Sequence, residues 1–169
     1  MKVPEMDWTI FRKRITIEKP MEEVYSAWAT KDGMESWFLE KADYRDATDK
    51  FRKSNELVKK GDAFTWKWHN WDFEENGIIL KENGIDLISF TFGSGGNVIV
   101  NLEPSELRTE IILTQENIPS DDKAKKDFFV GCSNGWTFWL TNLKAWMEYG
   151  ITLNAKGLKQ EETRDLVNS

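Results

Sequence analysis

The chain has 169 residues, of which 23 are Lys or Arg and 29 are Asp or Glu, so its formal net charge is −6. One cysteine, Cys132, excludes an internal disulfide and a multi-cysteine zinc site, and one histidine, His69, excludes a two-histidine metal site. The acidic balance argues against a nucleic-acid partner, and no apolar run approaches the length of about 20 residues that spans a membrane. We therefore expect a cytoplasmic protein with neither metal nor cofactor, folded as one domain over residues 1–169.

The amino-terminal residues predict one strand and two short helices. Apolar residues alternate with polar ones across 9–18, which indicates a half-buried strand. Pro20 can stand at the start of a helix, and apolar residues then recur every three or four positions as far as Trp28. Thr30 can cap a second brief helix that carries Trp37 toward the core.

Residues 44–60 have a different composition, rich in Lys, Arg, Asp and Glu. Such a segment is typical of an exposed connection rather than a regular element. We expect it to be mobile, and it could serve as a lid.

From Gly61 to residue 114 the pattern is that of an antiparallel meander. Short apolar-alternating runs are separated by turn signals at 82–84, 93–97 and 104–105. With the first strand, these runs predict at least six strands in a strongly bent antiparallel sheet.

A long helix is predicted from Asp121 to Tyr149, about 43 Å in length at 1.5 Å per residue. Ser120 can cap its start, and Gly150 is placed to end it. Its apolar stripe needs a large partner surface, which only the concave face of the sheet can supply. We expect the polar tail, 151–169, to be loosely attached, with a helical turn or two within 160–167.

Few residues suggest catalysis. His69 is expected at a solvated rim, because it lies on the polar face of its strand, and Cys132 is expected as a buried structural thiol. The run from Gly93 to Gly96 lacks the spacing of a phosphate-binding loop and is interpreted as a hairpin turn. Adjacent acidic pairs such as Glu74-Glu75 cannot share one face and are interpreted as solvated charge.

Aromatic residues from several predicted elements point toward one interior. They either fill a solid core or line a partly open cavity, and we favour the cavity because so many buried indole nitrogens are hard to satisfy internally. Trp8 and Trp71 have no place in the pattern. The candidate ligand-binding residues are Trp28, Trp37, Trp66, Trp68, Phe90, Phe92, Cys132, Trp136 and Trp139.

The order of strand, two short helices, meander and long carboxy-terminal helix resembles the α+β helix-grip fold of the START-like (SRPBCC, or Bet v 1-like) superfamily. More narrowly, the chain resembles homologues of the activator of heat-shock protein 90 ATPase over a core of residues 8–150. The residues that carry this resemblance are Ile15-Thr16-Ile17 with Pro20, Val24 and Trp28; Thr30 with Trp37-Phe38; 61–64; 77–79; 109–114 with Pro119; and 131–150.

The resemblance implies a hydrophobic cavity between the curved sheet and the long helix, which the superfamily uses for lipids, hormones and polyketides. It brings no shared catalytic motif. The eukaryotic namesake binds its chaperone through a separate amino-terminal domain, for which 169 residues leave no room.

Three hypotheses follow. The chain binds a small apolar molecule, flat or aromatic, without catalysis; or it is an enzyme of the cyclase or hydrolase type acting in the same cavity; or it is an interaction protein, chaperone-associated or homodimeric. The first accords best with converging aromatics and few ionisable groups. The enzyme alternative would draw on the ambiguous inward candidates Tyr25, Tyr44, Glu74 and Gln115.

Overall fold

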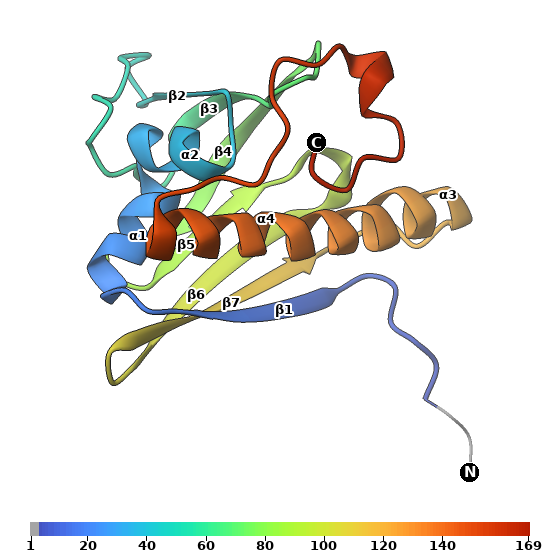
Figure 1. Ribbon diagram of the computed structural model, residues 1–169, viewed down its shortest axis with the longest axis horizontal. Coiled ribbons are helices and arrows are strands. Elements are labelled where there is room, and N and C mark those ends of the chain that lie inside the picture. The colour runs from blue at the N-terminus through green and yellow to red at the C-terminus, as the bar shows by residue number, and fades with distance from the viewer. Residues whose placement is uncertain (1–3) are drawn as a thin grey trace.

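A seven-stranded antiparallel sheet curves around one long helix in the computed structural model, which describes residues 4–169 (Figure 1). The strands lie in the order β1-β7-β6-β5-β4-β3-β2. Their bounds are β1 Phe11–Ile17, β2 Lys41–Arg45, β3 Ala63–Lys67, β4 Glu74–Glu82, β5 Leu87–Thr91, β6 Asn97–Ser105 and β7 Arg108–Glu116. The expected α+β helix-grip architecture is confirmed.

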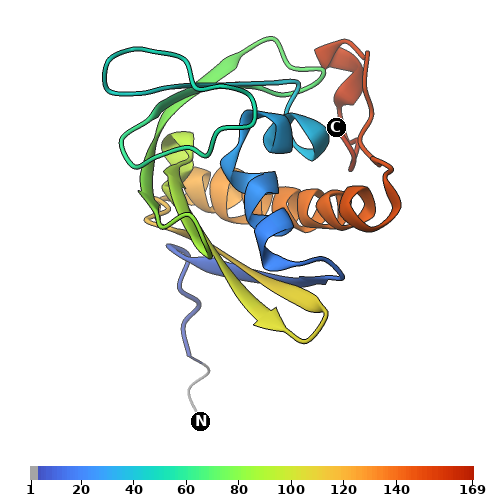
Figure 2. The ribbon, with the colours of Figure 1, turned by 90° about the vertical axis from the view of Figure 1, so that its left-hand side faces the viewer.

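Helices occupy the concave side of this sheet. The long helix runs across it, and the two short helices lie beside the carboxyl end of the long helix (Figure 2). The helical elements are α1 Met21–Ala29, α2 Lys31–Trp37, the 3-10 turn η1 Gly93–Gly95, α3 Asp122–Ala124, the π-helical η2 Lys125–Val130, α4 Gly131–Tyr149 and the 3-10 turn η3 Gln160–Thr163.

The connection between α1 and α2 depends on two residues. The Thr30 hydroxyl accepts a hydrogen bond from the Gly33 backbone N–H at 2.9 Å, which confirms the predicted cap. A Cβ on Gly33 would lie 2.3 Å from the Ser26 carbonyl oxygen, so only glycine allows α2 to fold back so closely on α1.

The long helix is less regular than the sequence pattern predicts. Its cap is Asp121, whose carboxylate accepts from the Ala124 N–H at 3.0 Å, and not Ser120. A π-helical stretch, η2, separates α3 from α4, and such stretches often lie at functional sites. The end is as predicted, because Gly150 takes a left-handed φ of 69° and donates to the Trp146 carbonyl.

Residues 44–60 are better anchored than expected. Their start belongs to β2, a strand the sequence did not predict. Arg52 donates two hydrogen bonds, at 2.7 and 2.9 Å, to the buried carboxylate of Asp62, and the Val58 N–H donates to the Ala29 carbonyl at 2.8 Å. From Asp46 onward the segment is a mostly exposed connection without a helix or strand, as predicted, but its charged side chains also form internal contacts.

The tail is also fixed in place. Asn142, fully buried in α4, accepts a hydrogen bond from the Leu153 N–H at 2.6 Å. Farther along, the Asn70 side chain donates to the Ala155 carbonyl and accepts from the Leu158 N–H, both at 2.9 Å. The expectation of a loosely attached tail is wrong, since two asparagines tie its backbone to α4 and to the β3–β4 loop. The predicted helical turn is present as η3.

Candidate ligand-binding site

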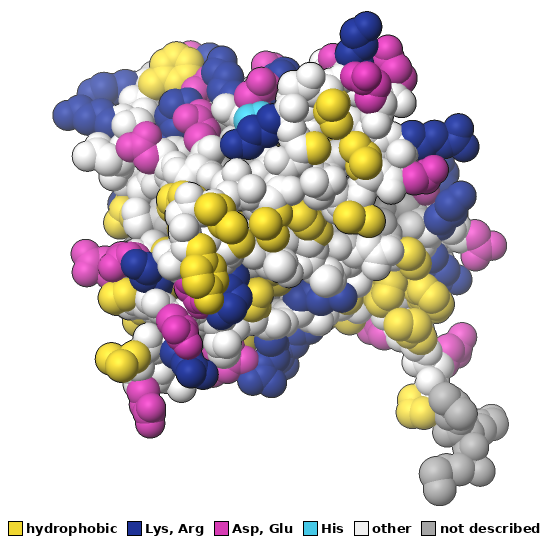
Figure 3. Space-filling model, in the orientation of Figure 1, with side chains coloured by type: hydrophobic (Ala, Val, Ile, Leu, Met, Phe, Trp, Pro, Cys, Tyr) yellow, Lys and Arg dark blue, Asp and Glu magenta, His cyan; other side chains and the backbone are white. Residues whose placement is uncertain are grey.

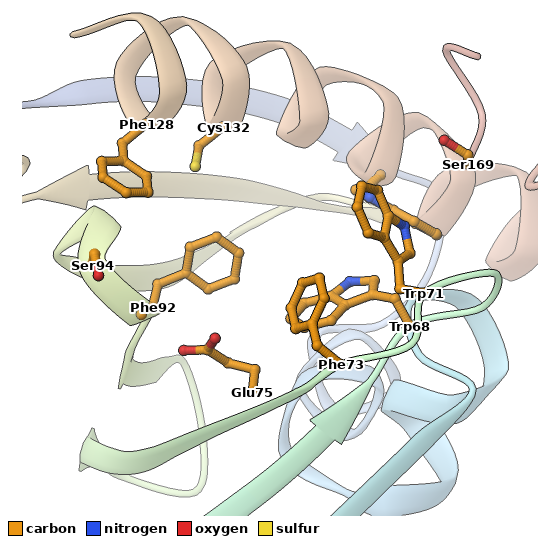
Figure 4. A pocket seen from close by; sticks show the side chains of 11 residues that line it. Trp68, Trp71, Phe73, Glu75, Phe92, Ser94, Phe128, Cys132 and Ser169 are labelled. Carbon is orange, nitrogen blue, oxygen red and sulfur yellow. The ribbon is translucent and has the colours of Figure 1, made fainter. Parts of the chain in front are cut away.

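A cavity of about 410 Å³ lies between the amino-terminal part of the long helix and the sheet. The loop after β3, the start of β4 and the end of β5 form one wall, and η2 with α4 forms the other (Figure 4). Its lining residues are Trp68, Trp71, Phe73, Glu75, Phe92, Gly93, Ser94, Phe128, Cys132, Trp139 and Ser169. Residues 44–60 contribute none of these, so they do not act as a lid here.

The aromatic wall is built by contacts between rings that follow different strands. Trp68 meets Phe38 edge to face with centroids 5.5 Å apart, and it meets Phe92 in the same way at 6.3 Å. Phe73 lies 6.4 Å from Trp68 and 5.7 Å from Trp71. These contacts between rings fix the shape of one side of the cavity.

The nine candidate residues divide into two groups. Trp68, Phe92, Cys132 and Trp139 line the cavity, and Trp136 lines a smaller hollow of about 190 Å³ that shares all four. The other four line neither space and are at most 2% exposed in the core: Trp28, Trp37, Trp66 and Phe90.

Three buried indoles find partners inside the protein, whereas the equally buried Trp28 Nε1 has none within residues 4–169. The Trp37 Nε1 donates to the Ala27 carbonyl at 3.0 Å, and the Trp66 Nε1 donates to the Tyr44 hydroxyl at 3.2 Å. Trp136 donates to the Gln115 side-chain oxygen at 2.9 Å. These residues form a solid core, because each N–H is satisfied without water.

The cavity indoles differ in this respect. Within residues 4–169, the ring nitrogens of Trp68, Trp71 and Trp139 form no hydrogen bond to a protein acceptor. They remain available to water or to a ligand. Solid core and open cavity, the two alternatives drawn from the sequence, therefore both occur, at different ends of the same aromatic cluster.

Glu75 is a charged cavity residue that sequence reasoning missed. It pairs with Trp66 across β3 and β4, and directly opposed residues face the same side of a sheet, so its carboxyl points inward. Glu74 pairs with Lys67 and points outward, where it is exposed. Treating Glu75 as solvated charge, and Glu74 as an inward candidate, was wrong because β4 begins four residues earlier than the pattern shows.

The surroundings of Glu75 disfavour its charge. Burial raises the pKa of the Glu75 carboxyl, and the backbone N–H of Gly93 opposes part of that rise. Among residues 4–169, no basic side chain forms an ion pair with it. A half-buried carboxyl thus faces an aromatic space without a cationic partner.

Cys132 and His69 have limited chemical potential. The Cys132 thiol is half-buried at the cavity wall, and burial raises its pKa, so it is a thiol rather than a thiolate at neutral pH. His69 is half-buried beside the site and lines neither aromatic space; burial, with Lys156 nearby, lowers its pKa.

The residues named for the enzyme alternative do not meet at the cavity. The Tyr25 hydroxyl donates to the Leu87 carbonyl at 3.1 Å, on the far side of α1 from the site. Tyr44 is sealed against Trp66, and burial raises its pKa; the Gln115 amide donates to the Gly95 carbonyl at 2.8 Å. Each of these polar groups already has an internal partner.

No group of three or more His, Cys, Asp and Glu side chains is placed to hold a metal ion within residues 4–169. No helix there is both long enough and apolar enough to cross a membrane.

Solved structures share this fold. The protein SSP2350 from Staphylococcus saprophyticus is 23% identical, with a TM-score of 0.69 over 86% of this chain and 96% of that one. The Aha1 dimer from Colwellia psychrerythraea is 19% identical, with a TM-score of 0.62 over 83% and 97%. A protein of unknown function from Enterococcus faecalis, EF2215, is 12% identical, with a TM-score of 0.62 over 94% and 81%.

No curated protein matches the sequence significantly. The model of the family "Activator of Hsp90 ATPase homolog 1-like protein" matches residues 18–148, from the end of β1 to the end of α4. This span contains all the cavity residues except Ser169. The chain therefore belongs to the activator of Hsp90 ATPase homolog 1-like family.

Proposed function

We propose that this protein binds a small apolar molecule, flat or aromatic in shape, in the cavity between the sheet and η2–α4. The observation that carries the proposal is the aromatic lining of a space of about 410 Å³. Ligand pockets typically measure about 300–1,000 Å³ and combine apolar walls with a few polar groups. Rings fixed at the edge of such a space can stack on a flat ligand or meet it edge to face.

The unpaired indole nitrogens support the proposal. Trp68 and Trp139 come from opposite walls of the cavity, and both can donate to an oxygen or nitrogen atom of a ligand. Binding would then satisfy donors that the fold leaves to water, which is how polar groups orient a ligand in an apolar pocket.

The side chains at the cavity favour binding over catalysis. Glu75 and Cys132 are its two ionisable lining residues, and the raised pKa of Cys132 makes its sulfur a weak nucleophile. The cyclase- or hydrolase-type alternative requires an acid and a base converging on one substrate atom. Turnover of naphthyl esters that Glu75→Gln abolishes would favour that alternative.

The test is a titration with naphthalenemethanol, a flat neutral probe, followed by calorimetry and by tryptophan fluorescence. Because Cys132 is the chain's one cysteine and lies at the cavity wall, its alkylation by iodoacetamide reports occupancy of this site. We expect saturable binding and slower alkylation of Cys132, measured by mass spectrometry.

A matched pair of variants locates the binding. Cys132→Phe places a ring in the cavity, whereas Asn134→Phe adds the same ring on the exposed side of α4. We expect at least about tenfold weaker binding for the first and wild-type affinity for the second. The proposal fails if naphthalenemethanol and a panel of acyl alcohols do not bind, or if they bind Cys132→Phe as tightly as the wild type.

Partners and location follow from the same family and remain predictions. A homodimer is favoured by apolar side chains that lie in a row along the face containing α4 (Figure 3) and by exposed Tyr149, Ile151 and Leu153 at its carboxyl end. Light scattering checks the dimer, and a monomer at all concentrations would contradict it.

If the protein has a chaperone partner, we expect it to stimulate the ATPase of a cognate Hsp90. The predicted cytoplasmic location is checked by cell fractionation.

A further inference from the structure

We propose that the ligand is an organic cation: a flat apolar body carrying a protonated or quaternary amine, which sits beside the carboxylate of Glu75. The inference rests on the proposed function and names the ligand class for the same cavity. Three observations support it: the Glu75 carboxyl lies in the cavity wall, aromatic rings line the same space, and no basic side chain pairs with this carboxyl within residues 4–169.

Of the side chains that form the cavity wall, Glu75 has the one carboxyl group, and none is basic. Its carboxyl lies next to the ring of Phe92 and points toward Ser94, with Trp68 and Phe73 nearer the other end of the side chain (Figure 4). A ligand in the cavity therefore meets a carboxylate beside a wall of aromatic rings.

The missing partner is a cation. Two more deeply buried carboxylates in residues 4–169 each have a cationic partner. The Asp62 side chain is 3% exposed and pairs with Arg52. The Glu148 side chain is 8% exposed and pairs with Lys144. Glu75 has no such neighbour although it is half-buried. Burial without a counter-charge raises its pKa, and a bound ammonium group would supply the stabilisation that the fold omits.

The rings select the same sign of charge. Aromatic faces carry negative potential and attract ammonium groups within about 6 Å, most strongly for tryptophan. The Phe73 ring lies 6.4 Å from Trp68 and 5.7 Å from Trp71, centroid to centroid, and all three rings line the same cavity as Glu75. These rings and the carboxylate would both repel an anion, and the net charge of −6 adds a long-range bias toward cations.

Glu75 also has a local role that the test must separate. Its Oε1 lies so close to Gly93 that a Cβ there would approach it to 2.9 Å, and the Gly93 N–H favours the carboxylate form. Glu75→Gln keeps an oxygen acceptor of the same length at this place, so it removes the charge while it retains the contact with η1.

The experiment compares three probes of one shape: naphthylmethylamine, naphthalenemethanol and naphthoate, which are a cation, a neutral molecule and an anion at pH 7. For the wild type we expect the cation to bind about tenfold more tightly than the alcohol, and the anion more weakly than either. In Glu75→Gln the advantage of the cation should disappear, while affinity for the alcohol stays within about twofold.

Glu74→Gln is the matched control, because it removes the same charge from the exposed side of β4. It should leave the order of the three probes unchanged. An equal loss in both variants would overturn the proposal, since it would assign the effect to net charge. Circular dichroism and melting temperature verify that both variants fold.

A pH titration gives an independent readout. Affinity for a quaternary naphthylmethyl-trimethylammonium probe should fall as the pH is lowered through the raised pKa of Glu75 and should be flat in Glu75→Gln. A quaternary probe has no proton to lose, so the titrating group belongs to the protein.

The outcomes separate the two proposals. If naphthalenemethanol binds at the cavity but the cation binds no better, the cation proposal is overturned and the proposed function stands. If no naphthyl probe binds and the panel of acyl alcohols does not bind either, both are overturned.

Discussion

Two tryptophans one turn apart on α4 have different roles. Trp136 stacks on Phe38 with centroids 5.2 Å apart, donates to Gln115 and is 2% exposed. Trp139 meets the edge of the same Phe38 at 5.2 Å, lines the cavity and has no acceptor for its nitrogen within the described chain. Two neighbouring tryptophans on one helix thus differ in their ring nitrogens, because one is paired inside the protein and the other is left to water or a ligand.

The largest effect should come from the core side of this comparison. Trp136→Ala removes a buried indole and leaves the Gln115 oxygen unpaired, so we expect a loss of about 3–5 kcal/mol in the free energy of unfolding. Urea denaturation measures it. Trp71→Ala at the cavity should cost less than about 2 kcal/mol, and equal losses would show that the two regions are not energetically distinct.

The carboxy-terminal tail runs from the core, where the buried Asn142 binds it, to the cavity, where Ser169 forms part of the wall. Asn142→Leu would leave the Trp37 carbonyl and the Leu153 N–H without the partners they have at 2.6 Å, at a cost of about 2–3 kcal/mol. Hydrogen exchange at the Leu153 amide should accelerate, because the tail detaches before the sheet unfolds. Unchanged protection of this amide would mean that other contacts hold the tail; Asn134→Leu, on the exposed side of α4, is the control.

On the cavity side, Trp68→Ala should separate binding from stability. We expect about 1–2 kcal/mol of lost stability, since the ring is half-buried, and about tenfold weaker binding of naphthalenemethanol. Denaturation and calorimetry on one preparation measure both. A stability loss as large as that of Trp136→Ala would contradict this prediction, because it would show that Trp68 stabilises the fold as much as a core residue does.

The smallest effect concerns the unliganded stability of Glu75→Gln. The carboxyl pKa is raised in the folded state, so between the unfolded value, about 4.3, and the raised value the folded protein binds more protons. Stability therefore falls as the pH rises through this window. At pH 7 Glu75→Gln should exceed the wild type by less than about 1 kcal/mol, because water partly reaches the carboxyl, and the gain should vanish near pH 3. A variant less stable than the wild type at pH 7 would contradict this sign.

Local patterns predicted most of the fold. The Thr30 cap, the Gly150 terminator and the alternation in β1 and β7 depend on neighbours in sequence, and all agree with the structure. Strand β2 was missed because its five residues begin a highly charged segment, and its pairing with β3 is what makes it a strand.

The candidate site was predicted in part. Phe92 and Trp139 were found because alternation or helical spacing points them inward, and Trp68 because it continues the alternation of Trp66. Trp71, Phe73 and Ser169 lie in the β3–β4 loop, at its end and in the tail, where no period indicates direction. Phe128 lies within the helix predicted from Asp121 to Tyr149, but nothing in the pattern indicates that its ring borders open space.

The sequence alone established that aromatic rings dominate the interior and which apolar residues of the regular strands and helices face it, because facing follows from the period of a strand or helix. Tertiary structure was needed to divide that interior into core and cavity. The division depends on whether Ala27, Tyr44 and Gln115 lie within hydrogen-bonding distance of an indole, and on the register that turns Glu75 toward the rings. Both are contacts between elements distant in the chain, and the period of a single strand or helix gives no information about such contacts.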